Sequence, residues 1–182
     1  MKIKVGVSNR HIHLCKTDAD ILFGENYKFT KRNDLMQPGE YACDEVVKVS
    51  TDKHTFPYVR VLGPLRDYTQ VEVSKSDSDL LGIDPPIRDS GDLENSESVW
   101  LEGPNGKIFK KNCCIRANRH IHCNKTENIG HNNGDIVKVL FNDKIIDDVH
   151  IKEKDTYVLE FHIDKDDSLA LGINTGDYIN LE

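Results

Sequence analysis

The sequence lacks any long apolar run. No stretch is long enough to span a bilayer as a helix, and the N-terminus lacks the apolar segment of a signal peptide. We therefore expect a cytoplasmic protein with no membrane partner. The five cysteines are an odd number in a chain with no export signal, so we expect them to be reduced rather than paired.

Positive charge is also in short supply. The chain has 24 lysines and arginines against 31 aspartates and glutamates, which gives a net charge of −7. Proteins that bind nucleic acids usually carry a basic excess, so we expect no nucleic-acid partner. Anionic small substrates are not excluded, because a local basic pocket can lie on an acidic protein. Dinucleotide-binding glycine motifs, Walker A loops and nucleophile elbows are absent as well.

The pattern that is present is a series of short strands. A length of 182 residues allows one domain or two small ones, and a composition that is 37% hydrophobic and 30% charged is typical of a globular protein. Evenly spaced short strands with few helices indicate a mainly β fold of barrels or a sandwich. The expected strands are 2–8, 46–49, 56–62, 70–74, 98–102, 107–110, 113–117, 136–141, 145–151, 157–163 and 178–181.

Three short helices and several breaks punctuate these strands. Each expected helix, at 17–23, 77–81 and 166–171, is followed by a glycine that would end it. Thr17 or Asp18 is expected to cap the first helix. Residues 25–44 are expected to be turn-rich, and Gly63-Pro64 is expected to end a strand.

One pentapeptide, Asn-Arg-His-Ile-His, occurs twice, at 9–13 and 118–122. Residues two apart on a strand face the same side. Each copy therefore offers two neighbouring imidazoles, His11 and His13 in the first and His120 and His122 in the second. Neutral imidazole is a good ligand for zinc and related divalent metals.

The repetition extends beyond the pentapeptide and indicates an internal duplication. Ten residues separate Glu72 from Gly82, and ten separate His162 from Gly172, in two segments of matching pattern. Glu72 and His162 therefore occupy the same place in the two halves. Three protein ligands with an open position are typical of a catalytic zinc. The predicted ligand sets are His11, His13 and Glu72 for one metal, and His120, His122 and His162 for the other.

Other interpretations of these residues stay open. A duplicated barrel could keep its repeated histidines as packed or hydrogen-bonded strand residues. Cys15 follows His13 by two residues and would share its face if the strand continues, so it is an alternative metal ligand. Cys15 could also be a nucleophile that forms an acyl-enzyme.

An anionic substrate would need an arginine close to the metals. Arg66 lies six residues before Glu72 and is expected on the loop that enters the ligand strand, at the metal end of the barrel. Arg10 and Arg119 precede the histidine pairs and face the other side of their strands, which favours structural ion pairs. Arg88 lies in a polar Ser-Gly-Asp loop and is a weaker candidate for binding an anion.

Six segments, spread in order over nearly the whole chain, match a known family: 7–14, 61–66, 69–74, 87–92, 119–122 and 160–164. On these segments the chain resembles the phosphate propanoyltransferases, the phosphotransacylases of the propanediol-utilisation type. The resemblance implies an acyltransferase that converts short-chain acyl-CoA, acetyl or propanoyl, and inorganic phosphate reversibly into acyl phosphate and CoA. It also implies two β-barrel domains capped by short helices, with two zinc ions.

The resemblance assigns roles along the chain. Residues 1–9 and 118–182 would form barrel one, and residues 10–117 barrel two, with a small inserted sheet near 24–44. The first zinc would be left with a place for the CoA sulfur and the second with a place for water or phosphate. Arg66 matches the essential arginine of the family. Members sent to bacterial microcompartments carry an N-terminal extension, which is missing here, so a free cytosolic form is expected, with a homodimer as its assembly.

Two rival functions are consistent with the same residues. A two-metal hydrolase of thioesters or phosphoesters would activate water instead of phosphate. A non-catalytic, metal-stabilised binding module would use the metals only to hold the barrels together.

Overall fold

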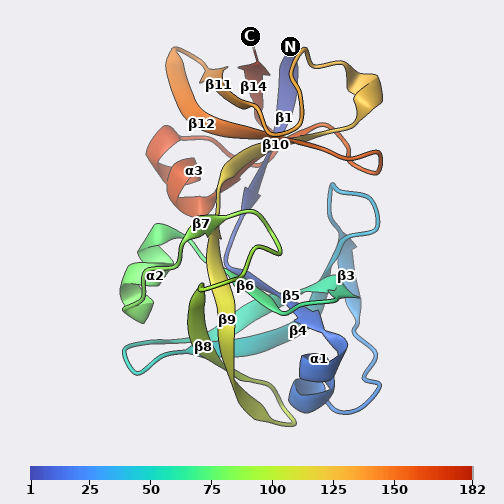
Figure 1. Cartoon of the computed structure of the whole chain (residues 1–182), viewed down its shortest axis with the longest axis vertical. Coiled ribbons are helices and arrows are strands. Elements are labelled where there is room, and N and C mark those ends of the chain that lie inside the picture. The colour runs from blue at the N-terminus through green and yellow to red at the C-terminus, as the bar shows by residue number, and fades with distance from the viewer. Residues whose placement is uncertain (182) are drawn as a thin grey trace. The chain divides into compact units, whose positions relative to one another are not determined.

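Closed six-stranded barrels dominate the computed structural model, which describes residues 1–181 (Figure 1). The mainly β fold with three short helices, expected from the sequence, is confirmed. In chain order the elements are β1 (Lys2–Ser8), β2 (His11–Cys15), α1 (Lys16–Phe23), β3 (Lys31–Asp34), β4 (Tyr41–Ser50), β5 (Thr55–Arg66), β6 (Gln70–Glu72), α2 (Lys75–Leu81), β7 (Ile87–Arg88), β8 (Glu97–Glu102), β9 (Lys107–Ala117), β10 (Arg119–Cys123), a 3₁₀ turn (Lys125–Glu127), β11 (Ile136–Phe141), β12 (Lys144–Glu153), β13 (Glu160–Asp164), α3 (Lys165–Leu171) and β14 (Tyr178–Leu181).

The chain divides into two compact units. Unit one consists of Met1–Asn9, Met36–Pro38 and the chain from Asn118 onward, and unit two of Arg10–Leu35 and Gly39–Ala117. The barrel of unit one has the strand order β1-β13-β10-β12-β11-β14. In Figure 1 the dark blue β1 joins the yellow-to-red strands of that barrel. In unit two the circuit runs β4-β5-β2-β6-β9-β8 and closes because β8 pairs with both β4 and β9.

The two barrels repeat the same pairing scheme. In unit two β2 pairs in parallel with β5 and antiparallel with β6, and in unit one β10 pairs in parallel with β12 and antiparallel with β13. The parallel pair β6/β9 likewise corresponds to β13/β1. The strand order and pairing directions therefore support the internal duplication that the repeated pentapeptide predicted.

Each unit has its own apolar core. In unit one Ile3 and Val5 of β1 are buried while Lys2 and Lys4 between them are exposed, as alternation along a half-buried strand requires. Unit two buries a separate cluster that includes Ile12 and Leu14. Among residues 1–181, no helix is both long and apolar enough to cross a membrane.

The structure corrects two local predictions. Strand β5 does not end at Gly63-Pro64 but continues to Arg66, and the Gly63–Pro64 peptide bond is cis. A side chain at Gly63 would overlap the ring of Tyr41, so glycine is the residue that lets the strand continue there. The expected strands 107–110 and 113–117 are one strand, β9. Within the segment 25–44, where the resemblance implied a small inserted sheet, β3 pairs with the beginning of β4.

The cap expected for the first helix is also wrong. Cys15 is the N-cap of α1, with no side-chain hydrogen bond, and neither Thr17 nor Asp18 fills that role. Asp18 is buried and forms an ion pair with Lys110 Nζ at 2.6 Å. The carboxylate of Asp18 therefore pairs with a residue distant in the sequence and does not cap the helix.

Candidate functional site

In unit two, the strand register brings the first ligand set together. His11 lies directly opposite Glu72 in the antiparallel pair of β2 and β6, and its Nε2 is 3.6 Å from the Oε2 of Glu72. The ring centroids of His11 and His13 are 5.0 Å apart, with the planes nearly perpendicular. All three predicted ligands of this set therefore lie on two adjacent strands.

In unit one, the equivalent strands bring the second set together. His120 lies opposite His162 in the pair of β10 and β13, just as His11 lies opposite Glu72. The ring centroid of His120 is 4.5 Å from that of His122 and 5.1 Å from that of His162. His122 and His162 have their centroids 6.3 Å apart.

Burial holds several of these imidazoles in the neutral form. It lowers the pKa of His13 and of His120 well below the usual value, and neighbouring positive groups add to the effect. Burial also lowers the pKa of His122 to about 4, with a smaller contribution from Lys152. Neutral imidazole is the form that binds a metal ion, so no proton has to be removed from these three residues at pH 7.

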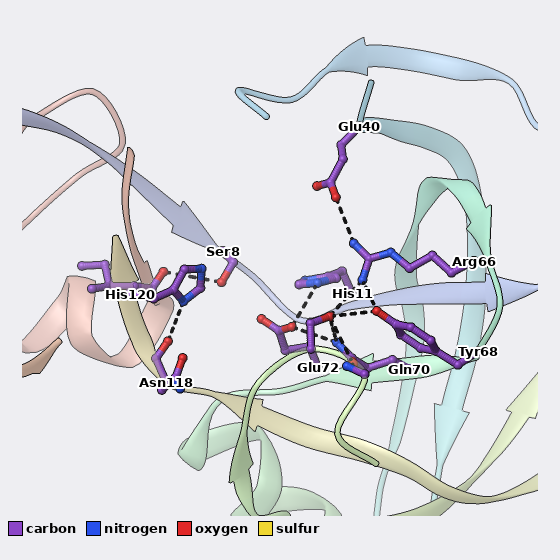
Figure 2. A network of polar contacts seen from close by, with 12 residues as sticks. Ser8, His11, Glu40, Arg66, Tyr68, Gln70, Glu72, Asn118 and His120 are labelled. Carbon is purple, nitrogen blue, oxygen red and sulfur yellow. Dashed lines mark hydrogen bonds and ion pairs between the residues drawn. The ribbon is translucent and has the colours of Figure 1, made fainter. Parts of the chain in front are cut away.

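Two of the ring nitrogens in the described part of the chain are buried without a hydrogen-bond partner. Within residues 1–181, the Nδ1 atoms of His13 and His122 are buried and make no hydrogen bond. They occupy the same position of the two pentapeptides, and an unsatisfied buried nitrogen is costly. His120 Nδ1 lies 2.8 Å from the carbonyl oxygen of Asn118 (Figure 2), which favours the tautomer with its lone pair on Nε2.

The side chains do not converge on a metal position as they stand. No group of three or more His, Cys, Asp or Glu side chains within the described residues is arranged to hold a metal ion. The rings of His120 and His162, for example, are stacked with 6° between their planes, so their nitrogens do not point at one another. The residue types, their register and their neutrality fit zinc, whereas coordination would require the side chains to rotate.

The sequence predicted that Arg66 lies on a loop, but it is the last residue of β5. Its partner in the pairing of β2 with β5 is Cys15, which is why the strand reaches that far. The Arg66 guanidinium donates through Nη2 to Glu40 Oε1 at 3.0 Å (Figure 2). Its positive charge also contributes to lowering the pKa of His13, which places that charge close to the first set.

Sequence reasoning missed the residues that hold Arg66. Arg66 Nη1 donates to the Tyr68 hydroxyl at 3.0 Å and to Ser90 Oγ at 2.9 Å. Ser90 belongs to the Ser-Gly-Asp loop, which the sequence marked only as a weak phosphate-binding candidate. No sequence pattern connects Glu40 to Arg66, because 26 residues separate them and only the fold brings them together.

The other arginines have structural partners. Arg10 forms an ion pair with Asp77 at 2.7 Å, and Arg119 forms a two-pronged pair with Asp167 at 2.6 and 2.7 Å, which confirms the prediction for both. Asp77 and Asp167 lie in the first turns of α2 and α3. Arg88 pairs with Asp92 at 2.8 Å within its own loop.

Cys15 is half-buried at the end of β2. The strand therefore continues from His13 to Cys15, as the alternative of a cysteine ligand required. The Sγ of Cys15 accepts a hydrogen bond from Thr69 Oγ1 at 3.4 Å. All five cysteines have free thiols. The metal-ligand role and the nucleophile role of Cys15 both stay predictions.

Glycine at position 6 makes room for a buried carboxylate beside His162. Gly6 is the register partner of His162 in the parallel pair of β1 and β13. A side chain at Gly6 would overlap the carboxylate of Glu160, which accepts a buried hydrogen bond from Gln37 Nε2 at 2.7 Å. The shape of this part of unit one therefore depends on a residue without Cβ.

We expect Gly6→Ala to lower the free energy of unfolding by about 1–3 kcal/mol, the range for overpacking a well-filled site. Urea titration of the purified variants measures it. In a Glu160→Ala background the same change should cost clearly less, because the overlapping carboxylate is gone. An equal cost in both backgrounds would contradict the steric explanation.

Comparisons with known proteins cover nearly the whole chain. A family model described as phosphate propanoyltransferase matches residues 4–174. A phosphate propanoyltransferase from Thermotoga maritima is 46% identical in an alignment that covers 97% of this chain and 87% of the relative. A protein of the same name from Priestia megaterium is 44% identical over 96% of this chain and 83% of its own length. One from Clostridioides difficile is 39% identical over 96% and 86%.

Proposed function

Because the chain belongs to the phosphate propanoyltransferase family, a family of acyltransferases, we propose that it transfers the acyl group of a short-chain acyl-CoA to inorganic phosphate. The products are acyl phosphate and free CoA, and the reaction runs in both directions. Acetyl-CoA and propanoyl-CoA are the proposed donors. Membership also confirms the resemblance that the six sequence segments carried.

The proposal includes one zinc ion in each ligand set. The donor types support it, since His, His and Glu in one set and three His in the other are ligands that zinc takes in catalytic sites. The orphaned Nδ1 atoms of His13 and His122 support it as well. A bound zinc ion would supply a Lewis acid that favours a thiolate or an anionic oxygen over the protonated form.

Arg66 is proposed as the catalytic residue that binds the anionic oxygens of the reaction. Within residues 1–181, Tyr68, Ser90 and Glu40 take three of its N–H groups. A guanidinium has five N–H donors in a planar fork, so two are left for a phosphate or for the oxyanion that develops on the thioester carbonyl. Fixed donors aimed at developing charge lower the barrier without reorganising solvent.

Glu40 supports this role because its carboxylate holds the guanidinium of Arg66 in place. A carboxylate at 3.0 Å keeps the guanidinium oriented, while its own side chain remains 37% exposed and screened by water. An exposed carboxylate neutralises only part of the positive charge. Arg66 therefore keeps attraction for an anionic substrate.

The observation that carries the proposal is the shared register of the two barrels. It sets Glu72 opposite His11 and His162 opposite His120, so each half offers three donors from the same two strands. A packed histidine core would not require a glutamate at one position and a histidine at its equivalent. The family match supports the reaction, the transfer of an acyl group to phosphate.

Product analysis tests the proposed function. Purified protein with acetyl-CoA or propanoyl-CoA should release CoA only when phosphate is present, and trapping with hydroxylamine should recover an equal amount of acyl phosphate. Release of CoA and free acid without phosphate would instead identify a hydrolase. No turnover together with a lower melting temperature on chelation would identify a binding module.

A further inference from the structure

A fully buried glutamine stands between the proposed catalytic arginine and a proposed metal ligand. Gln70, the first residue of β6, has no exposed surface, and a buried amide is stable only when its polar atoms are bonded. Its Oε1 accepts from the backbone N–H of Gly91 at 2.8 Å. Its Nε2 lies 3.0 Å from Ser90 Oγ and 3.3 Å from Glu72 Oε2.

Ser90 continues this chain of hydrogen bonds to Arg66. The Ser90 hydroxyl oxygen accepts from Arg66 Nη1 at 2.9 Å and from Gln70 Nε2 at 3.0 Å, which uses its two lone pairs. Figure 2 shows Gln70 between Glu72 and the hydroxyl of Tyr68, beneath Arg66. All these residues belong to unit two, so one amide links the guanidinium to the Glu72 carboxylate.

The equivalent position in the other half carries a different polar residue. Gln70 precedes Glu72 by two residues, and Glu160 precedes His162 by two. In unit two an amide donor lies beside a carboxylate, and in unit one a carboxylate lies beside an imidazole, with Glu160 Oε1 3.9 Å from His162 Nδ1. A polar side chain therefore lies beside the third proposed ligand in each half, and in unit two it is within hydrogen-bonding distance.

We propose that Gln70 is a positioning residue that holds both the guanidinium of Arg66, through Ser90, and the carboxylate of Glu72. This inference rests on the proposed function, because it gives Gln70 a role through Arg66 and Glu72. In this proposal Gln70 acts through these two residues and not by binding the substrate. Because the Gln70 amide is hydrogen-bonded to both Ser90 and Glu72, it keeps Arg66 and Glu72 in one fixed arrangement.

The test compares Gln70→Leu, which removes every hydrogen bond of the amide, with Gln70→Glu. The second variant keeps the shape and the acceptor for Gly91 but loses the donors to Ser90 and Glu72. Both should lower kcat for phosphate-dependent transfer by about tenfold, roughly the net worth of one hydrogen bond that holds a catalytic group, with little change in the KM for acyl-CoA. Normal kcat in Gln70→Glu would overturn the proposal, because shape alone would then suffice.

Zinc affinity gives a readout that does not depend on turnover. Competition with a colorimetric chelator should show one of the two zinc equivalents bound about 10–100-fold more weakly in Gln70→Leu. Ser90→Ala removes the bonds of the Ser90 hydroxyl to Arg66, Gln70 and Tyr68 but leaves the bond between Gln70 and Glu72, so it should lower kcat and leave both zinc affinities unchanged. Unchanged zinc affinity in Gln70→Leu would remove the Glu72 half of the proposal.

Double variants separate positioning from general destabilisation. Gln70→Leu should cost much less in an Arg66→Ala background than in the wild-type background, because its effect on kcat passes through Arg66. Thr69→Val is the matched control: it removes the partly buried hydrogen bond from the Cys15 backbone N–H next to Gln70, but none to Arg66 or Glu72, and its effect should be additive.

The outcomes also distinguish this inference from the function on which it rests. Wild-type turnover in Arg66→Ala, or no phosphate-dependent transfer at all, would overturn the proposed function. Loss of activity in Arg66→Ala with full additivity of Gln70→Leu would leave the function standing and overturn the positioning role of Gln70.

Discussion

Replacing Arg66 with alanine is expected to lower kcat/KM for phosphate-dependent acyl transfer by about 10²–10³-fold, the cost of one lost oxyanion donor. Zinc content should be unchanged, because Arg66 is not among the proposed ligands. The physical reason is that a planar fork held by Tyr68, Ser90 and Glu40 is fixed before the substrate arrives. Steady-state kinetics with elemental analysis of the same sample measures both quantities.

Two further variants make this result specific. Arg66→Lys keeps a positive charge but loses the fork, so it should recover only part of the activity. Arg88→Ala is the matched control, because Arg88 pairs with Asp92 in its own loop. A fall of similar size in Arg88→Ala, or near-normal turnover in Arg66→Ala, would contradict the assignment.

The second large effect is expected from the histidine pairs. His13→Ala and His122→Ala should each lower the zinc content from two ions per chain to one and abolish most of the turnover, by roughly 10²-fold or more, because each removes one of three ligands. The two variants should lose different ions, since one residue lies in unit two and the other in unit one. Elemental analysis after zinc loading and desalting gives the count.

Histidines outside the two sets provide the controls. His54→Ala and His131→Ala change residues that lack the repeated pattern, so both variants should retain two zinc ions and normal turnover. Two retained zinc ions in His13→Ala or in His122→Ala would show that the residue is a packed strand histidine.

Much of this fold could be read from repetition. Alternation in 2–8 predicted β1, and the glycines at 82 and 172 marked the ends of α2 and α3, where both adopt a left-handed conformation. The equal spacing to those glycines also identified Glu72 and His162 as equivalents. These features are local or periodic, so a single sequence contains them.

The features that were missed depend on tertiary contacts. Gly63-Pro64 looked like a break because nothing local shows that the ring of Tyr41 lies against Gly63 within a continuous strand. Asp18 looked like a cap because its partner Lys110 is distant in the sequence. The network around Arg66 joins Glu40, Tyr68, Gln70 and Ser90 through side-chain bonds that have no spacing rule.

The most direct test of the account is the number of metal ions bound by the unaltered chain. Protein loaded with zinc, freed of excess metal and analysed for elements should contain two zinc ions per chain, one for each ligand set. Phosphate-dependent acyl transfer should disappear on chelation and return with added zinc. A chain that binds no zinc, or that keeps full acyl transfer after complete removal of metal, would contradict the claim that the duplicated barrels hold two metal sites.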